Sequence, residues 1–288
     1  MSADFLQQMA VSSAARAEAA RRLLPDSAML ERALRTPVPP RLQLHSGGFD
    51  LIAELKLRSP AIGQLKSGTE NVAARVTAYA NSGAAAVSVL TEPSRFDGSM
   101  GHLEAATAVL NPLAVPAMRK DFLVDPYQVI EARAAGAGGV LVILRMLSKD
   151  GIETLLQRAR ELQLFVLLEA FDERDIEQMH ELVSGRDRPT LLAGVNCRDL
   201  TTLQVVPQRL DEMAHLLPTT VPRVAESGVG TAEDARRVAA AGYELALVGS
   251  ALMQGGDPRA LASAMLEAGR GARAGAGPKA DGRAGIQA

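Results

Sequence analysis

The sequence predicts an α/β fold in which eight parallel strands close into a barrel, and three observations lead to this fold class. Eight short runs are almost wholly apolar, as is typical of strands buried on both faces. Stretches rich in Ala, Leu, Arg and Glu separate the runs, and this alternation indicates parallel pairing through helical crossovers. The 288 residues, 47% of them hydrophobic, can build one large core. We therefore expect a (β/α)8 TIM barrel with an N-terminal helical extension.

The predicted strands recur along the chain in units of a helix, a glycine stop and a buried run. Three helices are expected to end at Gly83, Gly136 and Gly242, each shortly before a strand. Glycine just past a helix end adopts the left-handed conformation at little cost, so the chain can turn directly into the next strand. The predicted strands are 51–55, 87–90, 113–118, 140–144, 165–168, 191–195, 222–225 and 245–248.

Two segments flank the predicted barrel domain, which covers residues 49–270. Residues 1–48 have a helical pattern up to about residue 35, with a break at Pro25, and the prolines at 37, 39 and 40 end it. Both a helical layer over the barrel mouth and a flexible leader fit this pattern, and we expect the layer. Residues 271–288 are rich in Gly and Ala without an apolar period, so we expect a disordered tail.

Composition argues against several classes of function. The net charge of -2 and the lack of a Lys/Arg tract speak against a nucleic-acid partner, and the absence of Trp leaves few stacking surfaces. No apolar run is long enough to cross a membrane, and the first ten residues lack the features of a secretory signal. The single cysteine, Cys197, fits a cytoplasmic location. The four histidines show no ligand spacing, so no metal is expected. We expect a monomer, with an oligomer left open.

Polar side chains follow five of the predicted strands and indicate a common site. Alternate residues of a strand face the same side, so Glu54 and Lys56 point the same way while Leu55 faces the helices. The same parity leaves open which of Arg119 and Lys120 points inward. Solvated charges or ion pairs would explain any one of these residues, but their clustering favours an active site at the barrel mouth. The set comprises Glu54, Lys56, Lys120, Glu169, Asn196, Arg198 and Glu226.

Small residues after the last two strands indicate a phosphate site. Ser227 and Gly228 follow the seventh strand, and Gly249 and Ser250 follow the eighth. Backbone amides can approach a ligand closely at such positions, and these two loops often bind phosphate in barrels. Ser59 in the first loop offers a further hydroxyl donor. The expected ligand is therefore a phosphorylated small molecule.

Six motifs together resemble the indole-3-glycerol phosphate synthase family of tryptophan biosynthesis. The similarity runs from about residue 50 to 255 in family order, and the helical residues before it resemble the family's N-terminal extension. The motifs are Ile52-Ala53-Glu54-Leu55-Lys56-Leu57-Arg58-Ser59-Pro60, Leu90-Thr91-Glu92, Phe96-Asp97-Gly98-Ser99, Arg119-Lys120-Asp121-Phe122, Asn196-Cys197-Arg198-Asp199-Leu200 and Ala225-Glu226-Ser227-Gly228.

The resemblance implies ring closure of 1-(2-carboxyphenylamino)-1-deoxyribulose 5-phosphate, with loss of carbon dioxide and water and without a cofactor. It implies that Lys120 is the general acid at the ketone, and that Lys56 holds the carboxylate or acts as acid in the dehydration. It makes Glu169 a base, with Glu54, Asn196 and Glu226 orienting the substrate and lysines. Phe96 and Phe122 would form an apolar wall, Arg198 would lie near a polar end of the substrate, and Ser59, Ser227, Gly228, Gly249 and Ser250 would bind phosphate.

Four positions depart from the family pattern. Leu57 stands where a basic residue is usual, Ala61 replaces Ser, Phe171 replaces His or Asn, and Arg145 places a charge after the fourth strand. Two alternative enzymes therefore stay open: a divergent paralogue acting on a related amino-sugar phosphate, and an aldolase that forms a Schiff base on Lys120. A barrel that binds phosphate without catalysis is the third alternative.

Overall fold

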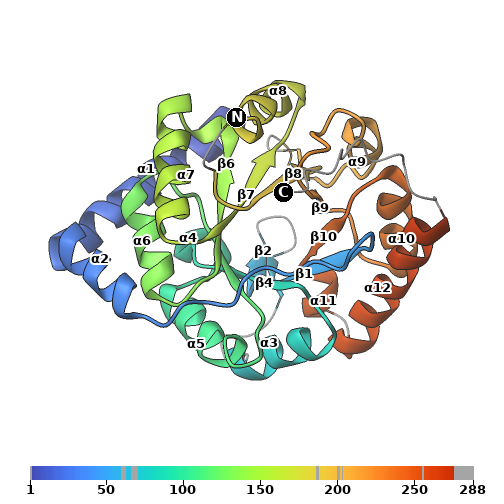
Figure 1. The fold of residues 1–288 in the computed structure, drawn as a ribbon, viewed down its shortest axis with the longest axis horizontal. Helices are drawn as coiled ribbons and strands as arrows, with labels where there is room; N and C mark the ends of the chain where they lie inside the picture. The colour runs from blue at the N-terminus through green and yellow to red at the C-terminus, as the bar shows by residue number, and fades with distance from the viewer. Residues whose placement is uncertain are drawn as a thin grey trace, which may run out of the picture.

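The chain forms a closed barrel of eight parallel strands surrounded by helices, as the sequence predicts (Figure 1). The computed structural model describes residues 2–59, 63–65, 71–185, 188–199, 202, 204–254 and 256–275. The strand order around the barrel is β1-β10-β9-β8-β7-β6-β5-β4, and a short β2-β3 hairpin lies in the first loop. The barrel strands are β1 (Asp50–Leu55), β4 (Ala86–Leu90), β5 (Ala117–Lys120), β6 (Gly139–Ile143), β7 (Phe165–Ala170), β8 (Leu191–Asn196), β9 (Arg223–Glu226) and β10 (Leu245–Val248), and the hairpin is β2 (Arg58–Ser59) and β3 (Gly63–Gln64).

Helices α3 to α8 and α10 begin at side chains that accept hydrogen bonds from the first turn. Asp125 caps α6, and the Gln128 side chain accepts a hydrogen bond from the Asp125 backbone amide, which completes a capping box. Gly83, Gly136 and Gly242 have positive φ angles, as predicted for the three glycine stops. The helices are α1 (Ser2–Leu23), α2 (Asp26–Arg35), α3 (Val72–Asn81), α4 (Pro93–Phe96), α5 (Met100–Leu110), α6 (Pro126–Ala134), η1 (Leu144–Met146), α7 (Lys149–Glu161), α8 (Glu173–Val183), α9 (Gln208–Met213), α10 (Ala232–Ala241), α11 (Ser250–Gln254) and α12 (Pro258–Gly275).

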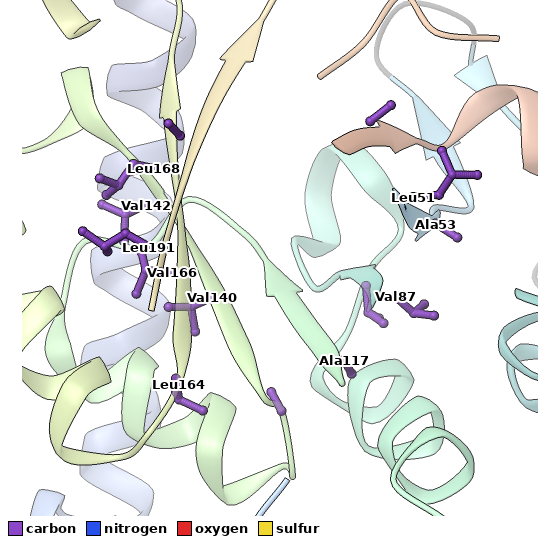
Figure 2. Packing of buried hydrophobic residues seen from close by; sticks show 14 of the residues in the cluster. Leu51, Ala53, Val87, Ala117, Val140, Val142, Leu164, Val166, Leu168 and Leu191 are labelled. Atoms are coloured by element: carbon purple, nitrogen blue, oxygen red, sulfur yellow. The ribbon is translucent and has the colours of Figure 1, made fainter. Parts of the chain in front are cut away.

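Side-chain parity along the strands separates two apolar clusters. Ile52, Met118 and Leu167 belong to the cluster that fills the barrel interior. Their neighbours in sequence, including Ala53 and Leu168, belong to the larger cluster between the strands and the helices, part of which Figure 2 shows. Because Ala53 and Leu55 lie in the outer cluster, Glu54 and Lys56 are directed inward, as the sequence predicts.

The third barrel strand is shorter than the sequence predicts. The run 113–118 was expected to form it, but residues 111–114 form a turn and β5 begins at Ala117. Ala114 has a φ of 58°, and the side chain of Leu113 is 45% exposed. Leu113 and Ala114 are apolar but belong to the turn that leaves α5, which an apolar run alone cannot distinguish from a strand.

The N-terminal segment contacts both ends of the barrel. The first turns of α1 reach the mouth, while α2 packs against α6 on the outside of the barrel, beside it in Figure 1. Leu42 and Leu44 then pack against the inner apolar cluster. The carbonyl of Pro40 lies close to Gly138, which precedes β6, so this part of the chain crosses the amino-terminal end of the barrel.

The C-terminal helix is longer than the sequence predicts. The tail was expected to begin at residue 271, but α12 continues to Gly275, so residues 271–275 are helical. Within this helix, Gly269 lies against the Phe49 ring, and Arg270 donates hydrogen bonds to the Phe49 carbonyl and to Asp50. These contacts fix the helix despite its Gly and Ala content. Residues 276–288 of the predicted tail lie outside the described part of the chain. Within that part, no helix has the length and apolar character needed to span a membrane.

Candidate active site

A cavity of about 1000 Å³ opens at the carboxyl ends of the barrel strands. Its lining includes residues from β1, β5, β7, β8, β9 and β10, so every strand that carries a predicted site residue contributes to it. The predicted polar residues in the lining are Glu54, Lys56, Lys120, Glu169, Asn196, Arg198, Glu226, Ser227 and Ser250, and the lining also includes Asp121, Thr202, Gln204, Asp234 and Gln254.

Lys120 lies at the centre of the charged residues in the cavity. Its Nζ donates a hydrogen bond of 3.2 Å to Glu226 Oε2 and lies 3.7 Å from Glu169 Oε2. The Lys120 side chain is 15% exposed, whereas both carboxylates are almost fully buried. Glu169 Oε2 and Glu226 Oε1 have no hydrogen-bond partner among the described residues. The site therefore holds acceptor atoms that a ligand could satisfy.

The pKa values of Lys120 and Glu226 are both raised, for different reasons. Burial lowers the pKa of Lys120, but attraction to Glu169, Glu226 and Glu54 outweighs it, so the pKa is raised. Burial raises the pKa of Glu226, and repulsion by Glu169 raises it further. Lys120 is an ammonium at neutral pH, the form that a proton donor requires.

Lys56 and Glu54 form a second ion pair in the cavity. Lys56 Nζ lies 2.6 Å from Glu54 Oε1, and only 11% of the lysine side chain is exposed. Although burial raises the pKa of Glu54, Lys56 and Lys120 lower it more, so Glu54 is ionised. Gly249 provides space for this pair, because a Cβ at that position would lie 2.3 Å from Glu54 Oε1. The close approach explains why glycine stands there.

Asn196 connects Glu169 to Arg198. Its side-chain amide donates a hydrogen bond of 2.5 Å to Glu169 Oε1, and its oxygen accepts one from the Arg198 backbone amide. Asn196 thus fixes the Glu169 carboxylate on the side away from Lys120. Cys197, between them in sequence, is buried in the cluster between strands and helices, on the opposite face from the cavity.

The loops after β9 and β10 form the end of the cavity predicted to bind phosphate. Ser227 and Gly228 have φ angles of 66° and 70°, so two successive residues adopt the left-handed conformation that favours glycine. Ser250 begins α11 next to Gly249. Gly228, Gly249 and Ser250 all line the cavity. The side chain of Ser59 lies outside the described part of the structure, as does Ala61.

Another part of the lining is apolar and follows β4 and β5, and β5 lies across the barrel from β9 in the strand order. Phe96 and Phe122 line this part with ring centroids 6.0 Å apart. Phe5 of α1 meets Phe122 edge to face at 5.9 Å, and Leu6 lines the cavity beside it. The expected helical layer over the mouth did not single out Phe5 and Leu6, because a helical pattern does not tell which of its residues reach the cavity.

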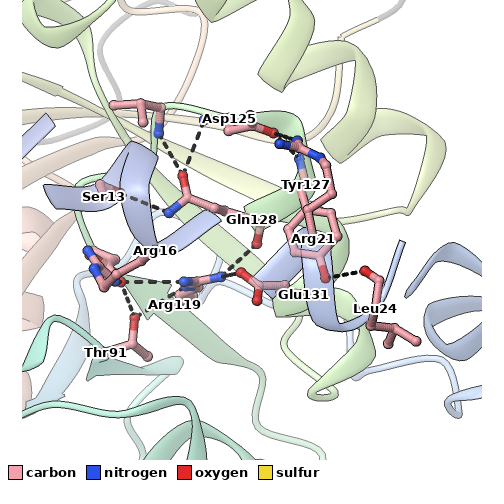
Figure 3. Close-up of polar contacts among 12 residues, drawn as sticks. Ser13, Arg16, Arg21, Leu24, Thr91, Arg119, Asp125, Tyr127, Gln128 and Glu131 are labelled. Carbon is pink, nitrogen blue, oxygen red and sulfur yellow. Dashed lines mark hydrogen bonds and ion pairs between the residues drawn. The ribbon is translucent and has the colours of Figure 1, made fainter. Parts of the chain in front are cut away.

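Arg119 and Lys120 point to opposite faces of β5. Arg119 is 2% exposed and donates to the Gln128 carbonyl and to Glu131, away from the cavity (Figure 3). Arg119 also lies beside Asp121. The Asp121 carboxylate accepts hydrogen bonds from Nη1 and Nη2 of Arg16 in α1, at 2.9 and 2.8 Å. Sequence parity left the choice open, and the structure directs Lys120 into the cavity.

The remaining departures from the family pattern have distinct surroundings. Leu57 is buried in the outer apolar cluster, an environment that favours leucine over a charged side chain. Phe171 lines the cavity, and Arg145 contacts its ring from outside. Among the described residues, no group of three or more His, Cys, Asp and Glu is arranged to hold a metal ion.

Solved structures with the same fold include two barrel enzymes. The 3-hexulose-6-phosphate synthase of Salmonella typhimurium matches with a TM-score of 0.60 and 14% identity, covering 78% of this chain and all of that one. The thiamine phosphate pyrophosphorylase of Pyrococcus furiosus matches with a TM-score of 0.57 and 14% identity, covering 78% and 96%. At this identity the likeness concerns the fold alone.

Sequence relatives are far more similar. The indole-3-glycerol phosphate synthase of Parafrankia sp. (strain EAN1pec) is 39% identical over 245 residues, covering 84% of this chain and 88% of its own. The protein of that name from Nocardioides sp. (strain ATCC BAA-499 / JS614) is 42% identical over 224 residues, covering 78% and 81%. A sequence model of the family matches residues 8–265. The chain belongs to the indole-3-glycerol phosphate synthase family.

Proposed function

We propose that the protein is an indole-3-glycerol phosphate synthase, a carbon-carbon lyase of tryptophan biosynthesis in the cytoplasm. It would convert 1-(2-carboxyphenylamino)-1-deoxyribulose 5-phosphate into indole-3-glycerol phosphate, carbon dioxide and water. The observation that carries this proposal is the hydrogen bond of the Lys120 ammonium across the barrel to Glu226, inside one cavity whose lining includes Phe96 and Phe122 as well as Gly228 and Gly249. The substrate has matching groups: an aromatic ring, a ketone and a phosphate.

Lys120 is the proposed general acid. Ring closure joins the aromatic carbon that bears the carboxylate to the ketone carbon, and the ketone oxygen gains a proton as the bond forms. A positioned acid typically contributes ~10²- to 10⁴-fold to such a step. The carboxylates around Lys120 keep it protonated, because they raise its pKa. They also hold its Nζ in place through the contacts to Glu226 and Glu169.

Lys56 and Glu169 are the proposed partners of Lys120 in the later steps. Lys56 holds the carboxylate that leaves as carbon dioxide, or donates the proton with which the hydroxyl leaves as water. Glu169 accepts the proton whose removal makes the new ring aromatic. Its orientation by Asn196 supports this role, since a base must be aimed at the carbon that it deprotonates. Glu54 and Glu226 orient the two lysines.

The two ends of the cavity supply orientation. Phe96 and Phe122 would contact the aromatic ring. The amides near Gly228, Gly249 and Ser250 would bind the phosphate, and Ser59 and Ser227 would add hydroxyl donors. Arg198 would bind a polar group between the two ends of the substrate. Holding both ends of a flexible substrate brings the reacting carbons together, and orientation can contribute on the order of 7 kcal/mol or more in favourable cases. The proposed substrate is therefore bound by the same groups that align it.

A Schiff-base aldolase is the second candidate, and one observation favours it: Lys120 is buried at a strand end, as nucleophilic lysines are. The raised pKa of Lys120 speaks against it, because a nucleophilic amine must be unprotonated.

The test uses purified protein with the substrate and follows the fluorescence of indole-3-glycerol phosphate. Product formation at a rate of order 1 per second or faster would support the synthase. Borohydride added during turnover should leave the protein mass unchanged. A covalent adduct on Lys120 would support the aldolase, and the absence of both product and adduct would contradict both enzymes.

A further inference from the structure

Two residues that depart from the family pattern, Arg145 and Phe171, contact each other at the edge of the cavity. Phe171 follows β7 and lines the cavity two residues after Glu169, whereas Arg145 lies in η1 after β6 and is not part of the lining. The guanidinium carbon of Arg145 lies 4.9 Å from the centroid of the Phe171 ring. This distance is typical of a cation–π contact.

Asp175 of α8 fixes both members of this pair. A single oxygen of Asp175 accepts hydrogen bonds from Arg145 Nε at 2.8 Å, from Arg145 Nη2 at 2.6 Å and from the Phe171 backbone amide at 2.8 Å. Asp172 adds a second carboxylate 2.5 Å from the guanidinium. The two carboxylates therefore neutralise the Arg145 guanidinium on one side, and the Phe171 ring stacks against its other side. Asp175 holds the Phe171 backbone directly and the Phe171 ring through Arg145.

The cavity receives only the apolar part of this arrangement. Phe171 is 6% exposed and belongs to the inner apolar cluster with Phe122, Ile143 and Leu6. The charge of Arg145 stays behind the ring, compensated by Asp172 and Asp175. A His or Asn side chain at position 171 would instead direct a hydrogen-bonding group into the cavity.

We infer that Phe171 is a specificity-determining residue for the aromatic end of the substrate, and that Arg145 and Asp175 are its positioning residues. The inference rests on the proposed function and concerns which aromatic rings that site accepts. An apolar ring wall favours an unsubstituted or methylated substrate ring over one that carries a hydroxyl group, since the hydroxyl would lose its hydrogen bonds to water without gaining a partner.

The test compares kcat/KM for the substrate and for its ring-hydroxylated analogue. Phe171→Asn should lower kcat/KM for the unsubstituted substrate by about 10-fold and raise the relative preference for the hydroxylated ring by a similar factor. Phe171→Leu, which keeps an apolar side chain, should preserve the preference. An unchanged preference in Phe171→Asn would overturn the inference.

The positioning role is tested with Arg145→Met and Arg145→Lys. Arg145→Met should raise KM several-fold with little change in kcat, because the ring loses its restraint while Lys120 and Glu169 stay in place. Arg145→Lys should restore part of the affinity, as a lysine keeps the charge but not the flat stacking surface. Arg158→Met is the matched control, since Arg158 pairs with Glu161 on the outer surface of α7.

Melting temperatures of all variants separate positioning from misfolding. Arg145→Lys keeps the charge opposite Asp175, so it tests the inference even if Arg145→Met unfolds. An unchanged KM in both folded Arg145 variants would overturn the positioning role. If the unaltered protein shows no turnover, the proposed function is wrong and this inference falls with it. If the unaltered protein is active but the variants keep its ring preference and its KM, the inference alone is wrong.

Discussion

The cavity can be compared with a second polar cluster, here called the network, which consists of Ser13, Arg16, Thr91, Arg119, Asp121, Gln128 and Glu131. Both bury charged groups, but they satisfy these groups differently. In the cavity, Glu54, Glu169 and Glu226 face two ammonium groups, and two carboxylate oxygens lack a hydrogen bond among the described residues. In the network, both oxygens of Asp121 accept hydrogen bonds, from Arg16, Thr91 and the Phe122 amide. Arg16 Nε in the network also lacks a partner, but among the described residues Glu169 Oε2 and Glu226 Oε1 are the only buried carboxylate oxygens without one. Unsatisfied buried acceptors cost stability, so the pair indicates a site kept for binding.

β5 separates these two regions by one residue. Lys120 faces the cavity and Arg119 faces the network, where it contacts Glu131, the Gln128 carbonyl and Thr91. Figure 3 shows that α1 enters the network through Arg16 and Ser13, which joins Gln128. The comparison therefore predicts that substitutions on the cavity face change turnover, whereas those on the network face change stability.

The largest effect is expected for Lys120→Ala. Loss of the acid should lower kcat by about 10²- to 10⁴-fold, while an unreactive alcohol analogue of the substrate still binds. Steady-state fluorescence and calorimetric binding measure the two quantities. Lys149→Ala is the control, because Lys149 forms an exposed pair with Glu181. Full activity of Lys120→Ala would refute the assigned acid.

Arg119→Met should have the opposite signature. Removing the guanidinium leaves Glu131 and part of Asp121 uncompensated, and breaking a buried pair costs about 3–5 kcal/mol in the free energy of unfolding. Urea unfolding measures this loss, with the exposed Arg236→Met as control. Turnover by the fraction that remains folded should stay within several-fold. A stable Arg119→Met protein without activity would reverse the comparison.

The strand ends were predictable because parity and charge act locally. Glu54, Lys56, Glu169 and Glu226 each follow an apolar run, so their convergence required only that the strands be parallel. A helical layer over the mouth was expected, but the contacts that dock α1 were not predictable, because Arg16 and Asp121 are 105 residues apart and nothing in either local pattern indicates the other. The predicted start of β5 was wrong because residues 111–114 form a turn, which leaves Leu113 outside the sheet although its apolar character suggests a strand.

Arg16→Gln sharpens the comparison, because it removes the ion pair between Arg16 and Asp121 and leaves the other contacts of Asp121 in place. Asp121 keeps Thr91, Arg119 and the Phe122 amide, and the Arg16 side chain is 27% exposed. We expect a loss of about 1–2 kcal/mol in the free energy of unfolding at neutral pH. KM should also rise, because α1 carries Phe5 and Leu6 into the cavity.

The pH dependence identifies the cause of that loss. Although burial raises the pKa of Asp121, its bonds to Arg16 and the charge of Arg119 lower it to about 2. A lowered native pKa stabilises the protein above the ordinary carboxyl value and ceases to do so as the pH falls toward 2. The deficit of Arg16→Gln should therefore be smaller at about pH 3 than at about pH 7. Arg22→Gln, on the exposed side of α1, should show no such trend.

Glu226→Gln should have the smallest effect on stability, and its sign distinguishes the two regions most directly. Burial and the nearby Glu169 raise the pKa of Glu226, so the native state retains a proton that the unfolded state has already released. The unaltered protein therefore loses stability as the pH rises from the ordinary carboxyl value through the raised one, and a neutral glutamine avoids this loss. Relative to the unaltered protein, the variant should gain about 1 kcal/mol at about pH 8.5 and less at about pH 5, with lower turnover at both. Melting curves at the two pH values, with the exposed Glu233→Gln as control, measure the difference. A variant that is less stable at both values would mean that the bond from Lys120 to Glu226 stabilises the fold, as the bonds to Asp121 do, and the cavity would then differ from the network only in position.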